Sequence, residues 1–217
     1  MIVNASLDTL ASRLTRLALH VKLDPVRRGG AETEAHLVER SQAGDRAAFE
    51  ELIRRHADRL YAVLLRFLGD PDDAAEASQE AFLRAWRSVG RFQNRSQFFT
   101  WLCRIGLNEA KRLGAKRAAR SSVTSIEDEA VPEAPDWSEA PHSRLDQGEL
   151  REVLERAVRG LPVEYRAPVI LRDVEGLTTK QAAAIMGIRE AAFKSRLHRA
   201  RLAVRQAVDE YVLEGEQ

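Results

Sequence analysis

Aromatic and cationic side chains are concentrated between residues 92 and 120, where the chain reads FQNRSQFFTWLCRIGLNEAKRLGAKRAAR. The aromatic members are Phe92, Phe98, Phe99 and Trp101. Aromatic rings offer surfaces on which exposed bases can stack, and cations beside them can follow the phosphates of an unpaired strand. The stretch therefore allows two interpretations, and the first is contact with single-stranded nucleic acid. An ordinary amphipathic helix with a buried aromatic face is the alternative interpretation.

A helix would arrange the second half of this stretch into two stripes, because residues three and four positions apart lie on the same side of a helix. One stripe is polar and consists of Arg104, Asn108, Lys111 and Arg112. The neighbouring stripe is apolar and consists of Phe98, Trp101, Leu102 and Ile105. We therefore expect the apolar stripe to face a core, and the polar stripe to face a nucleic-acid strand or solvent.

A second basic segment, near the C-terminus, has the features of a helix-turn-helix. Thr178 or Thr179 can cap a short helix that ends at Gly187, and a long helix is expected to begin near Arg189. One side of the long helix carries Phe193, Leu197, Ala200 and Val204. The opposite side and its flanks carry Lys194, Ser195, Arg196, His198 and Arg199. Such groups can bind base edges and phosphates in a major groove, so the pattern predicts a DNA-reading helix rather than a generic basic surface.

The composition indicates a helix-rich protein whose charges are segregated along the chain. Of the 217 residues, 44% are hydrophobic and 31% are charged, and strand-like alternation of β-branched residues is almost absent. The net charge is only +1, yet residues 104–120 and 189–205 are basic while residues 127–149 are acidic. Two basic segments predict two nucleic-acid contacts, and the low net charge indicates that the chain does not bind DNA tightly unaided.

Several classes of protein are excluded by the sequence. No apolar run approaches the ~20 residues of a membrane span, and no secretory signal is recognisable. Cys103 is the single cysteine, which excludes an internal disulfide and fits a reducing cytoplasm. The histidines lack metal-ligand spacing, and Cys103 lacks a recognisable base partner. We therefore expect no enzymatic activity, no cofactor and no metal, in a cytoplasmic protein.

Helix breakers and composition divide the chain into four predicted parts. These are an N-terminal helical extension (1–30), a helical domain (31–120), a flexible linker (121–146) and a second helical domain (147–217). The extension has an apolar seam from Leu7 to Val21, and the linker is acidic, proline-rich and contains Trp137. The predicted fold class is all-α, with two small helical domains joined by a flexible acidic linker.

Three helices are expected in the first domain before residue 92. Asp45 and Asp70 are predicted N-caps, and Pro71 suits a first helical position. The third helix turns Phe82, Trp86 and Val89 inward. Its outer surface then carries Glu76, Gln79, Glu80, Leu83, Arg84 and Arg87. These residues form either a solvated face or a docking surface for another protein.

Two ordered segments resemble one family. The first is DPDDAAEASQEAFLRAWR, followed by F-x(5)-F-x-TWLCRIGLNEAKR; it resembles region 2 of a bacterial RNA polymerase sigma factor of the extracytoplasmic-function (ECF, group IV) class of the sigma-70 family. The second, LPVEYRAPVILRDVEGLTTKQAAAIMGI with FKSRLHRAR, is similar to region 4 of that class. The resemblance covers about residues 35–117 and 147–208. It implies a protein that binds core RNA polymerase, recognises the −35 and −10 promoter elements and promotes initiation by melting the promoter.

The resemblance also implies roles for matching residues. It assigns −10 recognition to Asn94, Phe98, Phe99, Trp101, Asn108, Lys111 and Arg112, with the loop 92–99 capturing a flipped base. It assigns −35 recognition to Lys194, Ser195, Arg196, His198 and Arg199. It assigns docking on the coiled coil of the largest polymerase subunit to Asp73, Glu76, Gln79, Glu80, Leu83 and Arg84. The polymerase flap, promoter DNA and an anti-sigma factor are the further partners that it implies.

One departure and one alternative accompany this resemblance. The family commonly has Pro-x-Gly-Thr-Val before the recognition helix, whereas residues 189–193 here read Arg-Glu-Ala-Ala-Phe, which predicts a more regular helix start. The alternative is a stand-alone helix-turn-helix regulator that binds duplex DNA as a dimer. A regulator of that kind would explain residues 176–205 but not the aromatic loop or the 76–84 surface.

Overall fold

The computed structural model describes residues 32–120 and 147–214, and every regular element within those two ranges is helical. The chain divides into two compact units, residues 1–120 and residues 121–217. The predicted all-α class is therefore confirmed for the part of the chain that is described. The predicted extension 1–30 and the predicted linker 121–146, with Trp137, lie outside the described residues.

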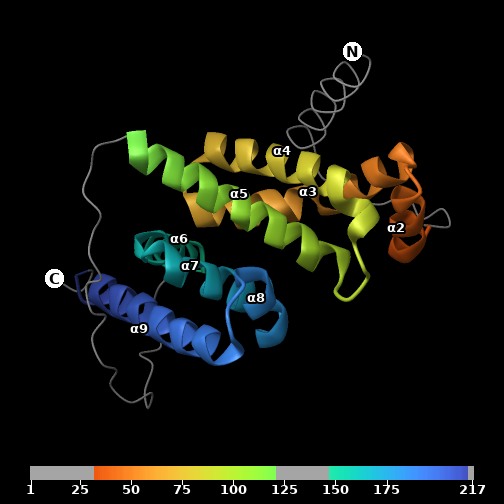
Figure 1. The fold of residues 1–217 in the computed structure, drawn as a ribbon. Coiled ribbons are helices and arrows are strands. Elements are labelled where there is room, and N and C mark those ends of the chain that lie inside the picture. The colour runs from red at the N-terminus through yellow and green to blue at the C-terminus, as the bar shows by residue number, and fades with distance from the viewer. Residues whose placement is uncertain (1–31, 121–146, 215–217) are drawn as a thin grey trace. The chain divides into compact units, whose positions relative to one another are not determined.

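The first unit is a small helical bundle. Its elements are α2 (Glu34–Gln42), α3 (Arg46–Leu68), α4 (Pro71–Ser88), the 3₁₀ turn η1 (Val89–Arg91) and α5 (Phe98–Arg120). The helices α3, α4 and α5 pack against one another, and α2 packs against α3 and η1 (Figure 1). Their apolar faces bury Phe49, Leu52, Leu60, Phe82 and Leu102 almost completely. This core fixes α4 and α5 side by side, so that both present an outer face to solvent.

Helix ends in this unit follow the predicted capping residues. The Asp45 carboxylate accepts hydrogen bonds from the Ala47 and Ala48 amides at 2.9 and 3.2 Å, and the Asp70 carboxylate accepts one from the Asp73 amide at 2.9 Å. Such caps satisfy amide groups that have no partner within the first helical turn. Asp45 is the N-cap of α3, Asp70 is the N-cap of α4, and Pro71 occupies the first position of α4, as predicted.

Gly106 allows α5 to approach α3 closely. A Cβ atom at this position would lie 2.9 Å from Leu60 Cδ1, and Leu60 is itself fully buried. Carbon atoms make favourable contact only at about 3.5–4.0 Å, so a larger residue would push the two helices apart. Gly114, two turns further along α5, has no atom within 4 Å of such a Cβ. The glycine at position 106 therefore has a packing reason that the sequence alone did not reveal.

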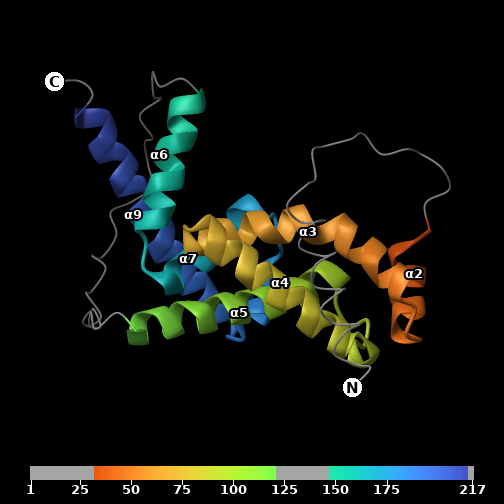
Figure 2. The same cartoon turned by 90° about the horizontal axis from the view of Figure 1, so that it is seen from above.

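The second unit contains a helix-turn-helix supported by two further helices. Its elements are α6 (Gln147–Gly160), α7 (Val163–Val169), the π-helical turn η2 (Ile170–Val174), α8 (Thr179–Met186) and α9 (Glu190–Glu214). The long helices α6 and α9 lie side by side (Figure 2). Thr178 forms a reciprocal capping box with Gln181, and Gly187 ends α8 with a φ of 70°. A left-handed residue of this kind is where glycine is favoured, so the predicted turn between α8 and α9 is confirmed.

Candidate nucleic-acid and polymerase interfaces

A short exposed loop leads from η1 into α5. All five of its residues, Gln93 to Gln97, are exposed, and Asn94 has a positive φ of 51°. Asparagine tolerates this left-handed conformation better than most residues. Just before the loop, Gln42 Nε2 on α2 donates a hydrogen bond to the Phe92 carbonyl oxygen at 2.6 Å. The hydrogen bond from Gln42 therefore fixes the backbone at the start of a loop whose polar side chains are exposed.

A cluster of rings lies beneath this loop. The ring centroids of Phe92 and Trp101 are 5.0 Å apart, and that of Phe98 lies 5.9 Å from Phe92 and 5.5 Å from Trp101. His56 on α3 joins the cluster, with its ring centroid 5.5 Å from that of Phe98 and 5.8 Å from that of Phe99. Aromatic rings at these separations attract one another beyond the burial of their area. The cluster is therefore a rigid support on which the loop and the first turn of α5 rest.

The two phenylalanines predicted to contact DNA are core residues. Phe98 and Phe99 are each only 2% exposed, so neither ring offers a face for base stacking in this conformation. Arg59 covers Phe99, with its guanidinium carbon 3.9 Å from the ring centroid. Trp101 is partly exposed and Asn94 is fully exposed. The geometry thus separates the predicted −10 set into loop and surface groups that can reach a base, and buried rings that support them.

The outer face of α5 carries Asn108, Lys111 and Arg112, all exposed as predicted. Between them lies Glu109, whose side chain is only 3% exposed. One Glu109 oxygen, Oε1, forms an ion pair with Arg84 of α4, whose Nε lies 2.7 Å away. The other oxygen, Oε2, accepts a hydrogen bond from Arg112 Nε at 2.9 Å and forms an ion pair with Arg112 Nη2 at 2.8 Å. A single buried carboxylate thus joins a residue predicted to meet polymerase to a residue predicted to meet DNA.

The predicted polymerase-docking residues on α4 fall into two groups. Glu76 and Arg84 are exposed, and Gln79, Glu80 and Leu83 are partly exposed on the same helix. Asp73 is different, because it is only 6% exposed and forms an ion pair with Arg117 near the end of α5. Burial raises the pKa of Asp73, and Arg117 opposes that shift. Asp73 is therefore placed to fasten α4 to α5 rather than to meet another protein.

The predicted DNA-reading face of α9 is exposed. Phe193, Leu197 and Ala200 are buried against the rest of the unit. Lys194, Ser195, His198 and Arg199 are exposed, and Arg196 is half-buried. The helix begins at Glu190, three residues after the glycine of the turn, Gly187. These side chains can donate to base edges and phosphates from one continuous helical surface.

An ion pair holds α9 to the turn that precedes α8. Arg201 Nε and Nη2 donate to the two carboxylate oxygens of Asp173 at 3.0 and 2.5 Å. This two-pronged geometry is the strong form of the arginine–carboxylate interaction, and Asp173 raises the pKa of Arg201. Arg201 is therefore engaged within the unit, next to the residues that are predicted to read DNA.

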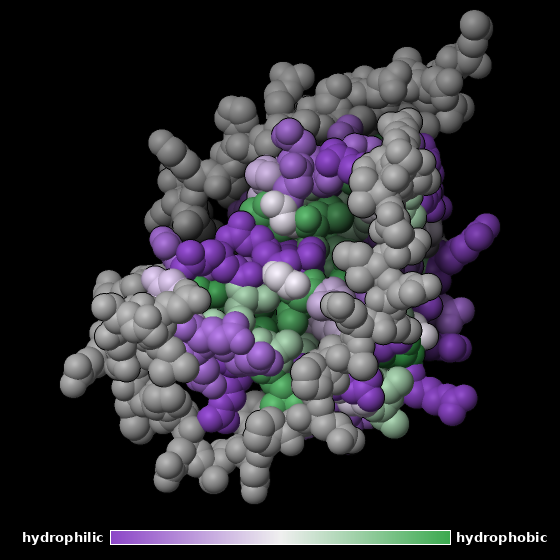
Figure 3. Space-filling view, turned by 90° about the vertical axis from the view of Figure 1, so that its left-hand side faces the viewer, coloured by the Kyte–Doolittle hydropathy of each residue, from purple (hydrophilic) through white to green (hydrophobic). Residues whose placement is uncertain are grey.

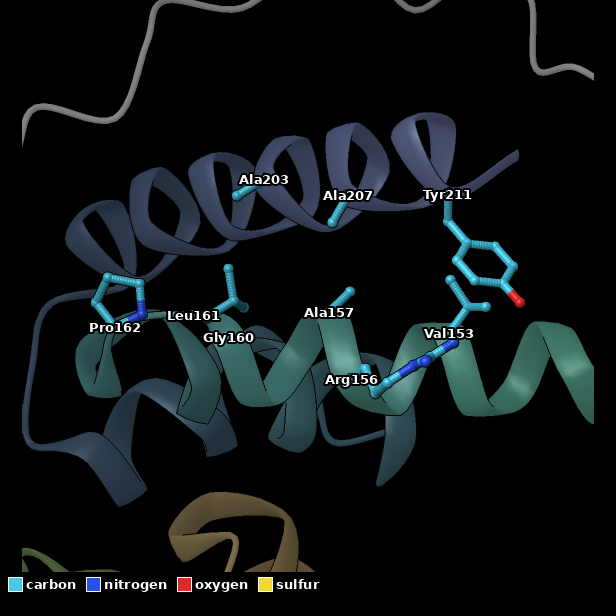
Figure 4. A pocket seen from close by; sticks show the side chains of 9 residues that line it. All are labelled: Val153, Arg156, Ala157, Gly160, Leu161, Pro162, Ala203, Ala207 and Tyr211. Carbon is cyan, nitrogen blue, oxygen red and sulfur yellow. The ribbon is translucent and has the colours of Figure 1, made fainter. Parts of the chain in front are cut away.

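An apolar groove lies between α6 and α9, on the same unit. Val153, Ala157 and Leu161 face Ala203 and Ala207 across it, with Arg156 beside the Tyr211 ring at its mouth (Figure 4). The large hydrophobic residues most exposed among the described residues are Leu154, Val163 and Val174, all in this unit. Hydrophobic surface is visible between bands of hydrophilic residues in the space-filling view (Figure 3). The groove brings together no acid, base and nucleophile of the kind that catalysis requires.

Three residues of the interfaces were missed by sequence reasoning. They are Gln42, which holds the loop; His56, which joins the ring cluster; and Glu109, which joins two arginines. His56 Nε2 lies 2.9 Å from Glu34 Oε2, and burial lowers the pKa of His56 while Glu34 opposes the shift. Glu109 could have been suspected, because an acid interrupts the otherwise basic surface of residues 104–117. Among the described residues, no cluster of three or more potential metal ligands occurs, and no helix has the length and hydropathy of a membrane span.

Comparison with known families matches both units. Residues 52–120 match the family described as Sigma-70 region 2, and residues 151–204 match the family described as Sigma-70, region 4. The first match contains α4, the loop and α5, and the second contains α8 and the exposed part of α9. The two family matches therefore cover the candidate interfaces described above.

Curated relatives extend this likeness over most of the chain. The RNA polymerase sigma-H factor of Pseudomonas aeruginosa is 32% identical over 193 residues, which cover 85% of this chain and 98% of that protein. The ECF RNA polymerase sigma-E factor of Escherichia coli K12 is 34% identical over 177 residues, covering 79% of this chain and 92% of that protein.

Solved structures agree at the level of the fold. CnrH, in complex with the cytosolic domain of CnrY, has a TM-score of 0.58 at 24% identity over 80% of this chain and 96% of that one. The sigma factor RpoE of Bartonella quintana, in complex with the anti-sigma factor NepR, has a TM-score of 0.58 at 25% identity over 74% of this chain and 96% of that one. With these relatives and both region matches in order along one chain, the protein belongs to the extracytoplasmic-function class of the sigma-70 family of bacterial RNA polymerase sigma factors.

Proposed function

We propose that this chain binds core RNA polymerase, recognises the −35 and −10 elements of a promoter and promotes strand separation at the start of transcription. The observation that supports the proposal is the presence, in one chain, of two exposed surfaces of polar and cationic side chains on separate helical units. One is formed by the loop 93–97 and α5, and the other by α9. A stand-alone regulator needs only the second.

At the −10 element, we assign binding of a flipped base to the exposed loop and binding of the neighbouring nucleotides to α5. Asn94 and the polar residues around it are available to bind a base that has left the stack, and Trp101 is the partly exposed ring beside them. Extrusion of a base costs a few kcal/mol, which hydrogen bonds and stacking in a shaped site can offset. Asn108, Lys111 and Arg112 are exposed on α5, and we assign to them contacts with the neighbouring nucleotides. Phe98 and Phe99 support this site from within the core.

At the −35 element, we assign base reading and phosphate binding to α9. The exposed residues Lys194, Ser195, His198 and Arg199 share one surface of the helix, and Arg196 is at its side. Polymerase docking is assigned to the outer face of α4, with Glu76, Gln79, Glu80, Leu83 and Arg84, but without the buried Asp73.

An anti-sigma factor is the further partner that we propose. The RpoE structure of Bartonella quintana contains its anti-sigma factor NepR, and that protein shares the fold of this chain. An inhibitor that covered α4 or α9 would prevent contact with polymerase or with the −35 element. Its identity would follow from the proteins that compete with core polymerase for this chain.

Run-off transcription with purified core polymerase on genomic DNA tests the proposal. We expect the chain to direct discrete start sites, each preceded by a common pair of elements, where core polymerase alone gives none. An Asn108→Ala variant should change the preference among −10 sequences while leaving the −35 preference unaltered. Absence of any start site that depends on the chain would overturn the proposal.

A further inference from the structure

The buried carboxylate of Glu109 lies at the point where α4 and α5 present their outer faces. It lines the groove between these helices together with Arg84, Arg87, Ser88, Ile105 and Asn108. Its two oxygens are divided between two arginines, Oε1 with Arg84 and Oε2 with Arg112. Both arginines are about half exposed, with 49% of the Arg84 side chain and 58% of the Arg112 side chain accessible.

We propose that Glu109 is a positioning residue for −10 recognition, which holds the Arg112 guanidinium in the orientation that meets a DNA phosphate or base. The inference rests on the proposed function and assigns a role within the same site. Arg112 uses its Nε and Nη2 groups on Glu109. Guanidinium has five N–H donors, so donors remain that can point away from the carboxylate, towards a strand lying along α5.

Preorganisation is the physical reason for such a role. A long arginine side chain loses rotamer freedom when it binds a ligand, and that entropy opposes binding. Arg112 is already ordered by a charge-assisted hydrogen bond from Nε and by the ion-pair contact of Nη2 with the same oxygen, so less freedom remains to be lost. The second arginine, Arg84, offsets the cost of burying the carboxylate and leaves the cluster with a net positive charge.

The contact with Arg84 links this role to polymerase binding. Arg84 belongs to the outer face of α4, which we assign to polymerase, and it forms an ion pair with the same carboxylate that holds Arg112. Any movement of Arg84 towards a partner therefore acts on Glu109 and, through it, on Arg112. The cluster is a short physical connection between the two faces, made of three side chains in direct contact.

Two substitutions separate positioning from simple electrostatics. Removing an acid beside DNA should tighten binding if only charge matters, because the site gains one positive charge. Positioning predicts the opposite for Glu109→Gln, with binding weaker by about three- to tenfold, from the cost of ordering one long side chain. Glu109→Asp keeps the charge but withdraws the carboxylate by one methylene. Electrostatics predicts no change for Glu109→Asp, whereas positioning predicts weaker binding.

The control is Glu51→Gln, which makes the same charge change elsewhere in the unit. Glu51 on α3 also lies between two arginines, with Arg55 Nε 2.7 Å from its Oε1 and Arg54 paired to its Oε2. Neither of these arginines belongs to a proposed interface. Glu51→Gln should therefore leave DNA affinity unchanged, which shows that the effect belongs to the Glu109 cluster rather than to net charge.

The experiment measures the affinity of reconstituted holoenzyme for fork-junction DNA that carries the −10 element of a promoter mapped by run-off transcription. We expect Glu109→Gln and Glu109→Asp to weaken binding, and Glu109→Gln to have no further effect when Arg112 is already alanine. Thermal unfolding of each variant identifies any loss of folded protein, and the Asp variant remains informative if the Gln variant unfolds. The inference would be overturned if both Glu109 variants bound DNA as tightly as the wild type or more tightly. It would also be overturned if Glu109→Gln still weakened binding in the Arg112→Ala background, or if Arg112→Ala alone had wild-type affinity. If wild-type holoenzyme bound no promoter fragment, the proposed function would fail as well, which distinguishes the two results.

Discussion

Aromatic residues that look alike in the sequence have different uses around the loop 93–97. Phe98 and Phe99 lie in the core, whereas Trp101 is partly exposed. The apolar spacing of residues 98–105 predicted a buried stripe, and the aromatic composition predicted stacking on bases; these two expectations conflict for Phe98. Burial decides between them, because a ring packed against His56 and Trp101 has no face left for a base.

We predict that acid weakens the packing beneath this loop through protonation of His56. Its ring packs on Phe98 and Phe99, burial lowers its pKa, and Arg59 and Arg55 lower it further while Glu34 opposes the shift. A histidine whose pKa is lowered by folding binds its proton more readily in the unfolded chain. The free energy of unfolding should therefore be highest above the ordinary histidine pKa. It should fall as the pH drops from that value towards the lowered pKa of His56 in the folded chain.

This prediction can be checked by urea denaturation between pH 7.5 and 5.5. We expect the free energy of unfolding of the wild type to decrease over this range, and the decrease to be smaller for His56→Gln. His36→Gln is the matched control, because His36 is exposed on α2. Equal pH dependence in wild type and His56→Gln would show that this ring does not govern the effect.

We predict that single exposed residues of α9 set the preference for the −35 sequence. Replacing Lys194 or Arg199 with alanine should weaken −35 binding by about 1–3 kcal/mol for the preferred sequence if the side chain reads a base, or equally for all sequences if it meets only phosphate. The measurement is holoenzyme affinity for promoter variants that differ at each −35 position. Gln206→Ala, further along α9 and also exposed, should leave every affinity unchanged. If both the Lys194 and Arg199 variants bound with wild-type affinity, the assignment of −35 recognition to α9 would be contradicted.

At the scale of the elements, helix boundaries were largely predictable because they depend on local chemistry. Asp45, Asp70 and Thr178 cap helices, and Gly187 turns between α8 and α9, as their residue types indicate. The closeness of α5 to α3 was not predictable, since it depends on two helices that are distant in sequence. The same limit applies to the Arg84–Glu109 contact, which joins α4 to α5.

Gly106 tests the packing of these elements. Gly106→Val should destabilise the first unit by about 1–3 kcal/mol, because extra methyl groups must fit against the buried Leu60. Gly114→Val on the same helix meets no neighbour and should change the free energy of unfolding by less than about 0.5 kcal/mol. Chemical denaturation of both variants provides the comparison. Equal stability of the two would mean that α5 does not press on α3 at this point.

At the scale of the whole molecule, the sequence predicted two helical units, and contacts within the described chain divide it between residues 120 and 121. The two family resemblances, at about residues 35–117 and 147–208, also predict two units in this order along the chain. The segments 1–30 and 121–146 lie outside the described residues. The net charge of the chain is only +1, which is too small to give tight DNA binding by attraction to phosphates alone. We therefore expect promoter binding to depend on polymerase.

Because we assign both DNA-binding faces to one polymerase-bound chain, the distance between the promoter elements should affect transcription. Inserting five base pairs between the −35 and −10 elements turns one relative to the other by about half a helical turn. Run-off transcription from such a promoter should drop sharply, whereas the same insertion upstream of the −35 element should have no effect. Equal transcription from both altered promoters would indicate that the two units do not act on one promoter together.

The most direct measurement is the affinity of the full chain for a mapped promoter fragment, alone and with core polymerase. Tight, sequence-specific binding should require both proteins, with protection extending over both elements. Specific protection of a symmetric duplex site by the chain alone, unaffected by core polymerase, would contradict the account.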